Sequence, residues 1–533
     1  MEKQVHFNKF NQGTADFVTP GRQLEYIADV HPDRDAIIAI DKEGSTSKIS
    51  YDRLRKDSNR LAHFLLERGI GPGSRVMVLY PNCIEHFIAA FAIWKTGACY
   101  VPVSHKAAAY EIEASCTALR PQAAFSDIEV PCTTLNIPLA KLPALLENQP
   151  DTFPPDVKAN PNLINLSGGT TGKMKFIRQT FPCGLDDQIL ESWFYMSGME
   201  FEERQLLTGP LFHGAPHTVG FNGLFCGNTL IVPRNLCPEN ILHLIEAYKI
   251  EYVQMVPTLM GRIGKLAACT KDALSSIRAL CHTGGACPAW LKEEWIELLA
   301  PEKVYEIYSM TECIGITCIR GDAWLKHKGS VGRPITGSKV SIRDMEGNEV
   351  PPDRIGEIYM TVPGHYRMTE YVNADPLREL PGGFRTVGDL GFVDKDGYLY
   401  YADRRTDVIV VGGENVFARQ VEEALLRYPK IHDAVVVGLP DEDMGRRLEA
   451  VIETPYKIDV AELETFLGQY LSAHKIPKIY HFEKALLRNP SGKPDRKALY
   501  AQCVKEDQAR KAQETAKKQM VPAAEQADNT VSF

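Results

Sequence analysis

The spacing of hydrophobic residues in the first part of the chain predicts strands that alternate with helices. Apolar residues recur at helical spacing over 51–69 and again over 81–97. Short apolar runs over 74–80 and 98–103 are typical of buried strands. This strand–helix–strand order predicts a largely parallel sheet that is covered by helices.

The same alternation recurs through the middle of the chain. Strands are predicted over 228–233, 251–257, 277–285 and 303–312, and helices near 238–248 and from Pro288 onward. After about residue 330 the pattern changes, because 339–350 and 391–403 each place a Gly turn between β-type runs and predict hairpins. The fold class expected for this large N-terminal part is α/β, with mostly parallel sheets and a β-rich subdomain.

A smaller α+β pattern follows. Helices are predicted over 418–428 and 460–472, and strands over 433–439, 447–454 and 479–483. About 100 residues with their own apolar segments favour a separate domain. From about residue 506 the chain is polar, which predicts a frayed helix or a disordered tail. The expected domains are a large domain over 1–406, a C-terminal lid domain over 407–505 and a tail over 506–533.

Composition narrows the class of protein. The 533 residues are 44% hydrophobic and 24% charged, as in a globular chain with two or more domains. A net charge of -8 and a pI of about 6.0 argue against nucleic acid as a partner. The N-terminus lacks the apolar core of a signal peptide, and the best apolar run, 87–94, is too short to span a bilayer. We therefore expect a cytoplasmic protein without stable membrane insertion that acts on a small molecule.

Cysteine and histidine spacing gives no clear metal site. The 13 cysteines include no C-x-x-C pair, so neither a disulfide framework nor a zinc ribbon is expected, and most should be small buried hydrophobes. His213 and His217 have the i, i+4 spacing of a helical metal pair. Gly214 and Pro216 stand between them and no Glu is adjacent, which disfavours a metal there.

The stretch LSGGTTGKMKF, residues 166–176, is similar to a phosphate loop. A Walker A loop requires Gly where Ser167 stands and Ser or Thr where Met174 stands, so two of its four fixed positions fail. The glycines, hydroxyls and lysines still suit an anion site. On its own the stretch leaves three alternatives: a surface turn, a P-loop kinase or NTPase, or another kind of phosphate loop.

Five further segments settle the choice by their order. They are GPLFHG (209–214), CHTGGACP (281–288), YSMTE (308–312), the stretch 384–416 and NPSGKPDR (489–496). Over nearly its whole length the chain resembles the adenylate-forming superfamily of acyl-CoA synthetases, luciferases and peptide-synthetase adenylation domains. The resemblance implies a loop that binds pyrophosphate, whereas an NTPase would leave YSMTE, VGDLG and SGKPDR unexplained.

The resemblance implies a reaction in two halves. A carboxylate attacks the α-phosphorus of ATP to give acyl-AMP and pyrophosphate, and a thiol then displaces AMP to give a thioester. The implied cofactors are ATP, CoA and Mg²⁺. Carboxylate oxygen is a poor nucleophile toward a polyanion, so fixed positive charge and Mg²⁺ must offset the charge that builds on the phosphates.

The resemblance also implies a nucleotide site. Glu312 matches the Mg²⁺ ligand, a hard oxygen donor, and Thr170 is the second residue implied at the metal. Asp389 in VGDLG matches the ribose ligand, because a carboxylate can accept from both hydroxyls. The implied adenine pocket comprises Tyr308 and the GGA of residues 284–286. The full set implied in ATP and AMP binding is Ser167, Thr170, Thr171, Gly172, Lys175, Gly284, Gly285, Ala286, Tyr308, Thr311, Asp389 and Arg405.

Residues near the C-terminus are implied in both half-reactions. Lys493 in SGKPDR matches the catalytic lysine, a compact cation on a flexible stem that can bridge carboxylate and α-phosphate. Asp407 matches the hinge about which a mobile small domain would rotate between the halves. The other implied catalytic residues are His213 and Arg405, and the implied CoA-binding residues are Gly412 and Gly413.

The loop departs from the usual pattern of the superfamily at three positions. Gly168, Met174 and Phe176 replace a Ser, a Pro and a Gly, which alters a hydroxyl, a rigid bend and a flexible exit. No Ser-bearing carrier domain follows the small domain, so free CoA is favoured as the thiol. A separate carrier protein is the alternative.

A narrower resemblance concerns the acid. The stretches SGGTTGKMKFIRQ, GPLFHGAPH, MTECIGITCIRGD and FNKFNQGTADFVTPGRQLEY are similar to the bile-acid CoA ligases of intestinal anaerobes. The run 217–225 offers small and apolar residues that could line a wide steroid pocket, or form a buried helix without ligand contact. The pocket residues expected are His217, Gly220, Phe221 and Gly223. A cholate-type bile acid is therefore the expected substrate, and another bulky aromatic or fatty acid is the alternative.

Overall fold

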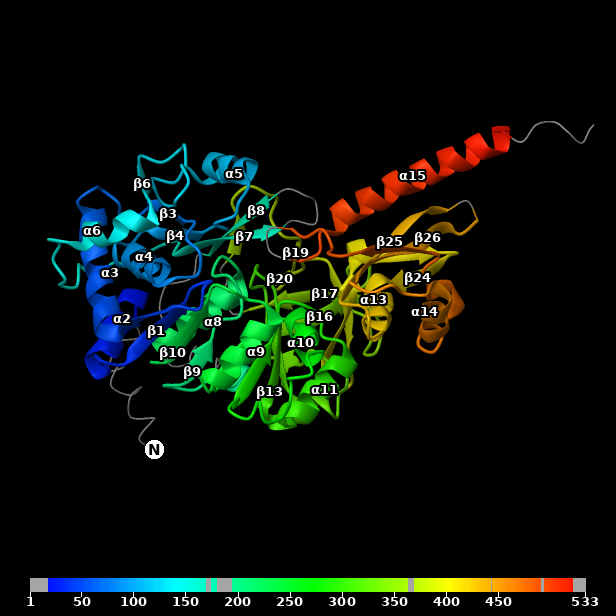
Figure 1. The fold of residues 1–533 in the computed structure, drawn as a ribbon, viewed down its shortest axis with the longest axis horizontal. Helices are drawn as coiled ribbons and strands as arrows, with labels where there is room; N and C mark the ends of the chain where they lie inside the picture. Colours follow the sequence, from blue (N-terminus) through cyan, green and yellow to red (C-terminus); the bar gives the residue numbers. More distant parts are fainter. Residues whose placement is uncertain are drawn as a thin grey trace, which may run out of the picture. The chain divides into compact units, whose positions relative to one another are not determined.

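A computed structural model describes residues 18–168, 174–179, 194–362, 369–441, 443–489 and 493–520. The chain divides into two units, Met1–Arg405 and Thr406–Phe533, each of which has its own sheets (Figure 1). The first unit holds a seven-stranded, a nine-stranded and a six-stranded sheet, and the second a two-stranded and a three-stranded sheet. The predicted fold class, a large α/β part with a β-rich region followed by a small α+β part, is confirmed.

The seven-stranded sheet contains the strands that flank the phosphate-like loop. Its order is β18(Thr369–Tyr371), β8(Met174–Gln179), β7(Leu163–Gly168), β4(Cys99–Pro102), β3(Arg75–Val78), β5(Ala123–Phe125) and β6(Leu135–Ile137). β4, β3, β5 and β6 are parallel, as the strand–helix–strand pattern predicts, and β7 pairs parallel to β4. β7, β8 and β18 are antiparallel neighbours, so β8 lies between the strand that enters the loop and β18.

Helices pack against this sheet and against one another. α2(Pro20–Val30), α3(Tyr51–Leu66) and α4(Ile84–Lys95) pack together, and α5(Ala109–Leu119) and α6(Leu142–Leu146) complete the helices of this region (Figure 1). α3 begins where the Ser50 hydroxyl accepts from the Arg53 amide, and it is followed by Gly69 with φ +73°. α4 is buried almost all round, which explains why its sequence, FIAAFAIW, is uniformly apolar.

The nine-stranded sheet carries most of the motifs. Its order is β15(Arg333–Pro334), β14(Ile316–Arg320), β13(Val304–Ser309), β12(Ala279–His282), β11(Tyr252–Met255), β9(Arg204–Leu206), β10(Thr229–Pro233), β1(Asp35–Ile40) and β2(Thr46–Ser50). The strands from β13 to β1 are parallel. β14 and β15 pair antiparallel at one edge, and β2 pairs antiparallel at the other. Its helices are α8(Gly214–Phe225), α9(Pro238–Ala247), α10(Pro257–Gly264), α11(Ala289–Leu299) and α12(Gly321–Trp324).

The six-stranded sheet is antiparallel. Its order is β19(Glu379–Leu380), β20(Phe384–Arg385), β17(Gly356–Thr361), β21(Asp389–Val393) and β22(Leu399–Arg404), and β16(Lys339–Arg343) also pairs with β17. The hairpin predicted over 391–403 is confirmed as β21–β22. The hairpin predicted over 339–350 is reduced to a turn with one bridge, Arg343–Glu349. Two prolines follow at 351 and 352 and cannot donate to a ladder, so β16 pairs with the later strand β17 instead.

The small unit is built on a three-stranded sheet, β25(Asp433–Asp441), β26(Gly445–Glu453) and β27(Ile479–Glu483). α13(Ala418–Leu426) and α14(Val460–Leu467) lie where helices are predicted, and β23(Val408–Val411) and β24(Glu414–Phe417) form a hairpin. α15(Arg496–Met520) begins beside β25 and extends away from the sheet (Figure 1). Of the two alternatives for the polar tail, the structure has a helix as far as Met520, and 521–533 lie outside the described residues.

One pair of cysteines is bonded, although the sequence gives no sign of a disulfide framework. Cys116 on α5 and Cys132, beyond β5, form a disulfide with their Cα atoms 5.7 Å apart. Their separation of 16 residues carries no signal in the sequence, because the contact depends on how the chain turns after β5. The other cysteines of the described segments are free and are buried or half-buried, as predicted. Within the same segments, the structure contains no helix with both the length and the apolar character needed to cross a membrane.

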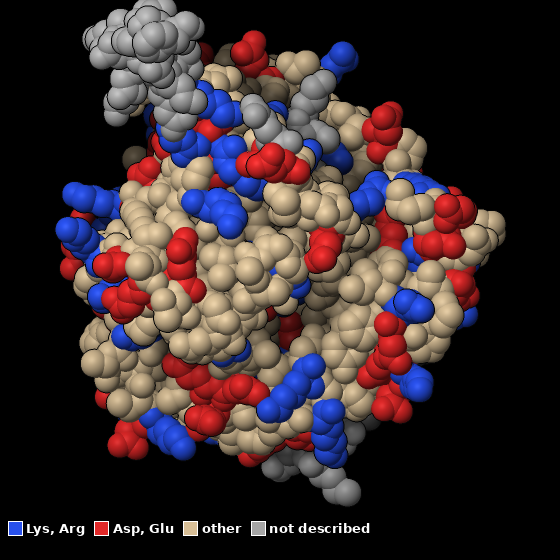
Figure 2. Space-filling view, turned by 90° about the vertical axis from the view of Figure 1, so that its right-hand side faces the viewer, with Lys and Arg blue, Asp and Glu red and all other residues tan. Residues whose placement is uncertain are grey.

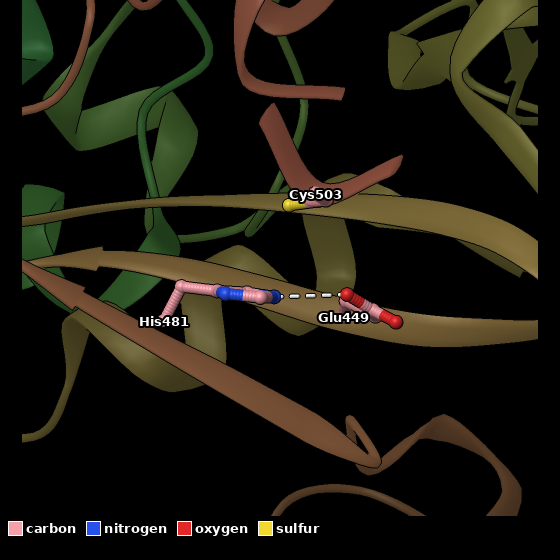
Figure 3. Close-up of side chains that lie close together, drawn as sticks. All are labelled: Glu449, His481 and Cys503. Atoms are coloured by element: carbon pink, nitrogen blue, oxygen red, sulfur yellow. Dashed lines mark hydrogen bonds and ion pairs between the residues drawn. The ribbon is translucent and has the colours of Figure 1, made fainter. Parts of the chain in front are cut away.

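An ion-pair network holds α15 on the sheet of the small unit. Glu449, His481 and Cys503 place ligand-type atoms within 4.8 Å of one another (Figure 3). His481 Nε2 lies 2.8 Å from Glu449 Oε2, and its Nδ1 lies 2.6 Å from Glu506 Oε2. Arg447 Nη2 lies 2.6 Å from Glu449 Oε1. Since both ring nitrogens face carboxylates, His481 fits this site as a protonated imidazolium rather than as a metal ligand.

The charge of His481 makes this network depend on pH. Hydrogen bonding with Cys503 and Glu449 raises the pKa of His481 to about 10, although burial opposes the rise. Because the pKa is raised in the folded state, the stabilisation that the charged His481 provides is fully present below the ordinary His pKa of about 6.5. It is then lost as pH rises toward about 10.

We expect His481→Gln to lower the free energy of unfolding of the small unit by about 1.5–3 kcal/mol at pH 6, since it removes hydrogen bonds to charged groups. The difference from wild type should shrink as pH rises from 6.5 to 10. Urea unfolding of the full chain at pH 6, 8 and 10 measures this. His474→Gln, at a more exposed His in the same unit, is the control. If the difference in free energy of unfolding between variant and wild type does not change with pH, the assignment of His481 as a protonated imidazolium is wrong.

Candidate active site

The strands around the phosphate-like loop are described, whereas its centre is not. Ser167 at the end of β7 pairs with Lys175 on β8. Thr170, Thr171 and Gly172 lie in 169–173, outside the described residues, so their predicted contacts with phosphate remain predictions. The side chain of Ser167 is also outside the described set. Lys175 is therefore the one predicted phosphate-binding side chain of the loop that the structure describes.

The structure brings Lys175 and Glu312 together through Tyr371. The Tyr371 hydroxyl donates to Glu312 Oε1 at 2.6 Å, and Lys175 Nζ lies 4.8 Å from the centre of the Tyr371 ring. Burial, followed by the charge of Glu312, raises the pKa of Tyr371, so its hydroxyl stays protonated. The sequence analysis missed Tyr371, because a Tyr in a short strand has no distinguishing spacing.

Two neighbouring parallel strands deliver the predicted adenine and metal residues to one edge of the nine-stranded sheet. β12 ends at His282, just before Gly284, and β13 ends at Ser309, just before Thr311 and Glu312. β12 and β13 are parallel, with His282 opposite Glu306, so their carboxyl ends face the same way. Such edges are where open α/β sheets bind ligands. Gly284 and Gly285 are exposed, and Gly284 has φ +82°, a conformation that favours glycine.

The predicted ribose ligand, Asp389, is held in a buried position. The Tyr308 hydroxyl donates to Asp389 Oδ2 at 2.8 Å. Burial raises the pKa of Asp389, and the nearby Arg404, whose Nε lies 3.5 Å from Oδ1, opposes the rise. Oδ1 is buried and has no hydrogen-bond partner among the described residues. A buried acceptor of this kind fits a ligand hydroxyl, because leaving it unsatisfied costs about 1–3 kcal/mol. Arg404 was also missed, although it adjoins the predicted Arg405.

Arg405 and Asp407 lie on either side of the boundary between the two units. In the large unit, Arg405 Nη1 lies 3.2 Å from Glu357 Oε2, and about half of its side chain is exposed. In the small unit, Asp407 Oδ2 lies 3.4 Å from Arg496 Nε. One 3₁₀ turn, Arg405–Asp407, contains both residues. Their predicted roles in catalysis and as a hinge remain predictions.

Lys493 and the glycines predicted to bind CoA lie at turns of the small unit. The Lys493 amide donates to Asn489 Oδ1 at 3.1 Å, and its carbonyl accepts from the Asn489 amide at 2.9 Å. These bonds fix the backbone of Lys493, and the residue is exposed. Gly412 and Gly413 have φ +58° and +84° and join β23 to β24. A two-residue hairpin with positive φ at both positions favours glycine.

His213 and His217 both lie at the start of α8. His213 caps the N-terminus of α8, where its backbone is extended. His217 is buried, with its ring stacked on Tyr100 at 5.4 Å and 4.8 Å from that of Phe221. Burial lowers the pKa of His217 to about 3, so it is neutral at physiological pH. The aromatic contacts of His217 are typical of core packing.

The glycines expected to line a wide pocket instead face the core. A Cβ on Gly223 would lie 1.8 Å from Gln205 Oε1, and one on Gly220 would lie 3.4 Å from Leu207 Cδ1. Phe221 is 2% exposed and packs against Phe87, Phe91 and Trp94. Of the two alternatives for this run, these contacts favour the buried helix, because small residues here let α8 approach the sheet closely.

Basic and acidic side chains are interspersed over the face of the molecule that Figure 2 presents. Association with nucleic acid requires Lys and Arg that gather into a continuous footprint. The described residues of that face show charges of both signs and no such footprint.

Comparisons with known proteins identify the family of the chain. A family model for AMP-binding enzymes matches residues 24–372, and one for the C-terminal domain of AMP-binding enzymes matches 420–493. The chain is 29% identical to 2-succinylbenzoate–CoA ligase of Bacillus licheniformis, over 88% of this chain and 97% of that protein. It is 30% identical to feruloyl-CoA synthase of an Amycolatopsis species, over 85% of this chain and 93% of that protein.

A solved structure is also similar. It is o-succinylbenzoate CoA synthetase from Bacillus subtilis in complex with its acyl-adenylate intermediate, with a TM-score of 0.77 and 26% identity, covering 90% of this chain and 97% of that chain. Since the first family model covers more than half of the sequence, the chain belongs to the AMP-binding enzyme family. Within that family it is an acyl-CoA ligase of the AMP-forming type.

The contacts of α8 predict different effects of two glycine substitutions. Gln205 is buried, donates to the Val219 carbonyl and accepts from Asn228, so it cannot yield to a Cβ on Gly223. Gly223→Ala should lower the free energy of unfolding by about 1–3 kcal/mol, as overpacking does. Gly220→Ala, which meets only ordinary contacts, should be neutral or stabilising because Ala favours helices. Denaturant unfolding of both variants measures this, and a fully stable Gly223→Ala variant would refute the packing account.

Proposed function

We propose that this ligase joins a bulky cyclic carboxylic acid to CoA, and that a cholate-type bile acid is its substrate. The observation that carries the nucleotide half of the proposal is the buried Asp389, whose Oδ1 has no hydrogen-bond partner among the described residues. A ribose hydroxyl would supply that missing donor. The bile-acid half rests on the resemblance of the stretches quoted above to bile-acid CoA ligases.

The first half-reaction would take place at the carboxyl ends of β12 and β13. The substrate carboxylate attacks the α-phosphorus of ATP, and pyrophosphate leaves. Glu312 offers the hard carboxylate oxygen that Mg²⁺ prefers, and the ion would offset the charge of the phosphates when bound. Lys175 adds fixed positive charge on the side of the loop. Tyr308 and Asp389 would hold the nucleoside, so that the reacting phosphorus is oriented before attack.

The second half-reaction needs a different group, a thiol that displaces AMP from the acyl-adenylate. We propose that Lys493 acts in adenylation, since a cation can bridge the carboxylate and the α-phosphate. The turn at Gly412 and Gly413 would then serve CoA, because glycine leaves the backbone open to a ligand. Separate residues for the two halves allow each half to be tested by itself.

A second candidate substrate is an aromatic acid. The similar ligases act, by their names, on 2-succinylbenzoate and on ferulate, which are smaller than a steroid. The burial of Gly220, Phe221 and Gly223 favours this candidate, since it removes the physical argument for a steroid-wide slot along α8.

A panel of acids decides between the candidates. Release of AMP, dependent on CoA, should be measured with cholate, deoxycholate, 2-succinylbenzoate, ferulate and palmitate. Under the proposal, kcat/KM is highest for the C24 bile acids. No AMP with any bile acid but good turnover of ferulate or 2-succinylbenzoate would overturn the substrate and leave the ligase assignment intact. ADP in place of AMP would overturn the reaction itself.

Lys493→Ala should slow adenylation by about 10²-fold or more, because a positioned cation that stabilises developing charge has an effect of this size. Pyrophosphate exchange into ATP measures that half. Thioester formation from supplied acyl-AMP should remain close to the wild-type rate. Lys484→Ala, at an exposed lysine of the same unit, is the control and should change neither half. Equal losses in both halves would show that Lys493 is not specific to adenylation.

A further inference from the structure

Tyr371 lies in a strand that is fixed to the exit of the phosphate-like loop. β18 pairs antiparallel with β8, and Tyr371 stands opposite Ile177. Beyond the strand, the Val372 amide donates to the Phe176 carbonyl at 2.9 Å, and Asn373 Oδ1 accepts from the Phe176 amide at 3.0 Å. The backbone around Tyr371 is therefore bound on both sides to the segment that follows Lys175.

The Tyr371 hydroxyl joins this sheet to the neighbouring one. Glu312 follows β13 of the nine-stranded sheet, whereas Tyr371 belongs to the seven-stranded sheet. Their O–O distance of 2.6 Å is typical of a hydroxyl that donates to a carboxylate. The bond occupies Glu312 Oε1 and so orients the plane of the carboxylate.

The ring of Tyr371 makes a second and separate contact. Lys175 Nζ lies 4.8 Å from the ring centre, within the distance at which a cation is attracted to an aromatic face. The side chain of Lys175 is long and otherwise flexible, so this contact limits the positions of its ammonium group. One side chain thus orients an anion through its hydroxyl and a cation through its ring.

We propose that Tyr371 is a positioning residue that sets Glu312 for Mg²⁺ and Lys175 for the phosphates of ATP. This inference rests on the proposed function of the site. A hydrogen bond to one oxygen limits the rotation of a carboxylate, and groups that hold metal ligands in this way often change metal affinity by 10- to 100-fold. The hydroxyl and the ring have different tasks, and substitutions can separate them.

The test compares Tyr371→Phe with Tyr371→Leu. Calorimetry measures ATP binding to the full chain without any acid, over a range of Mg²⁺ concentrations and also in EDTA. Tyr371→Phe keeps the ring and should raise the Mg²⁺ concentration for half-maximal binding about tenfold, while binding in EDTA stays unchanged. Tyr371→Leu should weaken binding in EDTA as well, because Lys175 loses its aromatic contact.

One control variant and one double substitution test whether the effect is specific to Tyr371 and Glu312. Tyr400→Phe removes another hydroxyl that donates to a carboxylate, at 3.2 Å from Asp394, and should leave both measurements unchanged. In a Glu312→Gln background, Tyr371→Phe should add little to the loss of Mg²⁺ dependence, since the two residues act as a pair. Full additivity of the two substitutions would overturn the pairing.

The outcomes separate this inference from the proposed function. If the wild-type enzyme releases AMP and Tyr371→Phe binds Mg²⁺ and ATP as wild type does, the positioning role is wrong and the function stands. If Tyr371→Phe weakens ATP binding equally with and without Mg²⁺, Tyr371 has a structural role only. This result would also overturn the positioning role. If no acid yields AMP but the Mg²⁺ shift is seen, the function is wrong and the role of Tyr371 at a metal–nucleotide site stands.

Discussion

Parallel pairing between β12 and β13 is the constraint on which the site depends. Parallel strands bring their carboxyl ends to the same edge, so residues about 25 positions apart in the chain become neighbours there. His282 and Glu306 are such a pair, and Gly284 and Glu312 follow the ends of the same two strands. The helix α11 between the two strands is buried through Leu291, Trp295 and Leu299, and this packing holds the crossover in place. The order of the motifs along the chain is therefore a consequence of sheet topology as well as of chemistry.

Much of the fold was predictable because hydrophobic spacing depends on short-range geometry. The apolar run over 98–103 predicts a strand and the structure has β4, and the Gly turn within 391–403 predicts the β21–β22 hairpin. Spacing does not tell which strand pairs with which. This is why β16 was expected to fold back on its own turn, whereas it pairs with β17.

The candidate site was predictable only where a motif carries it. Asp389, Glu312 and Lys493 lie in segments whose order is specific, so the sequence names them as candidates. Tyr371 and Arg404 hold two of those residues in position, yet neither stands at a distinctive spacing. For the run along α8, the sequence leaves a pocket and a buried helix open as alternatives. Gly220 and Gly223 suggest open space in a sequence, but a buried helix uses the same residues to approach a sheet.

The ion pairs at the boundary between the units limit how the chain can bend there. Arg405 is bound to Glu357 in one unit and Asp407 to Arg496 in the other, so a single residue, Thr406, separates the two attachment points. Each residue contributes only two soft backbone torsions. Between the two ion pairs the connecting chain therefore has only the few backbone torsions around Thr406. A glycine-rich insertion at this point would lengthen and loosen that connection.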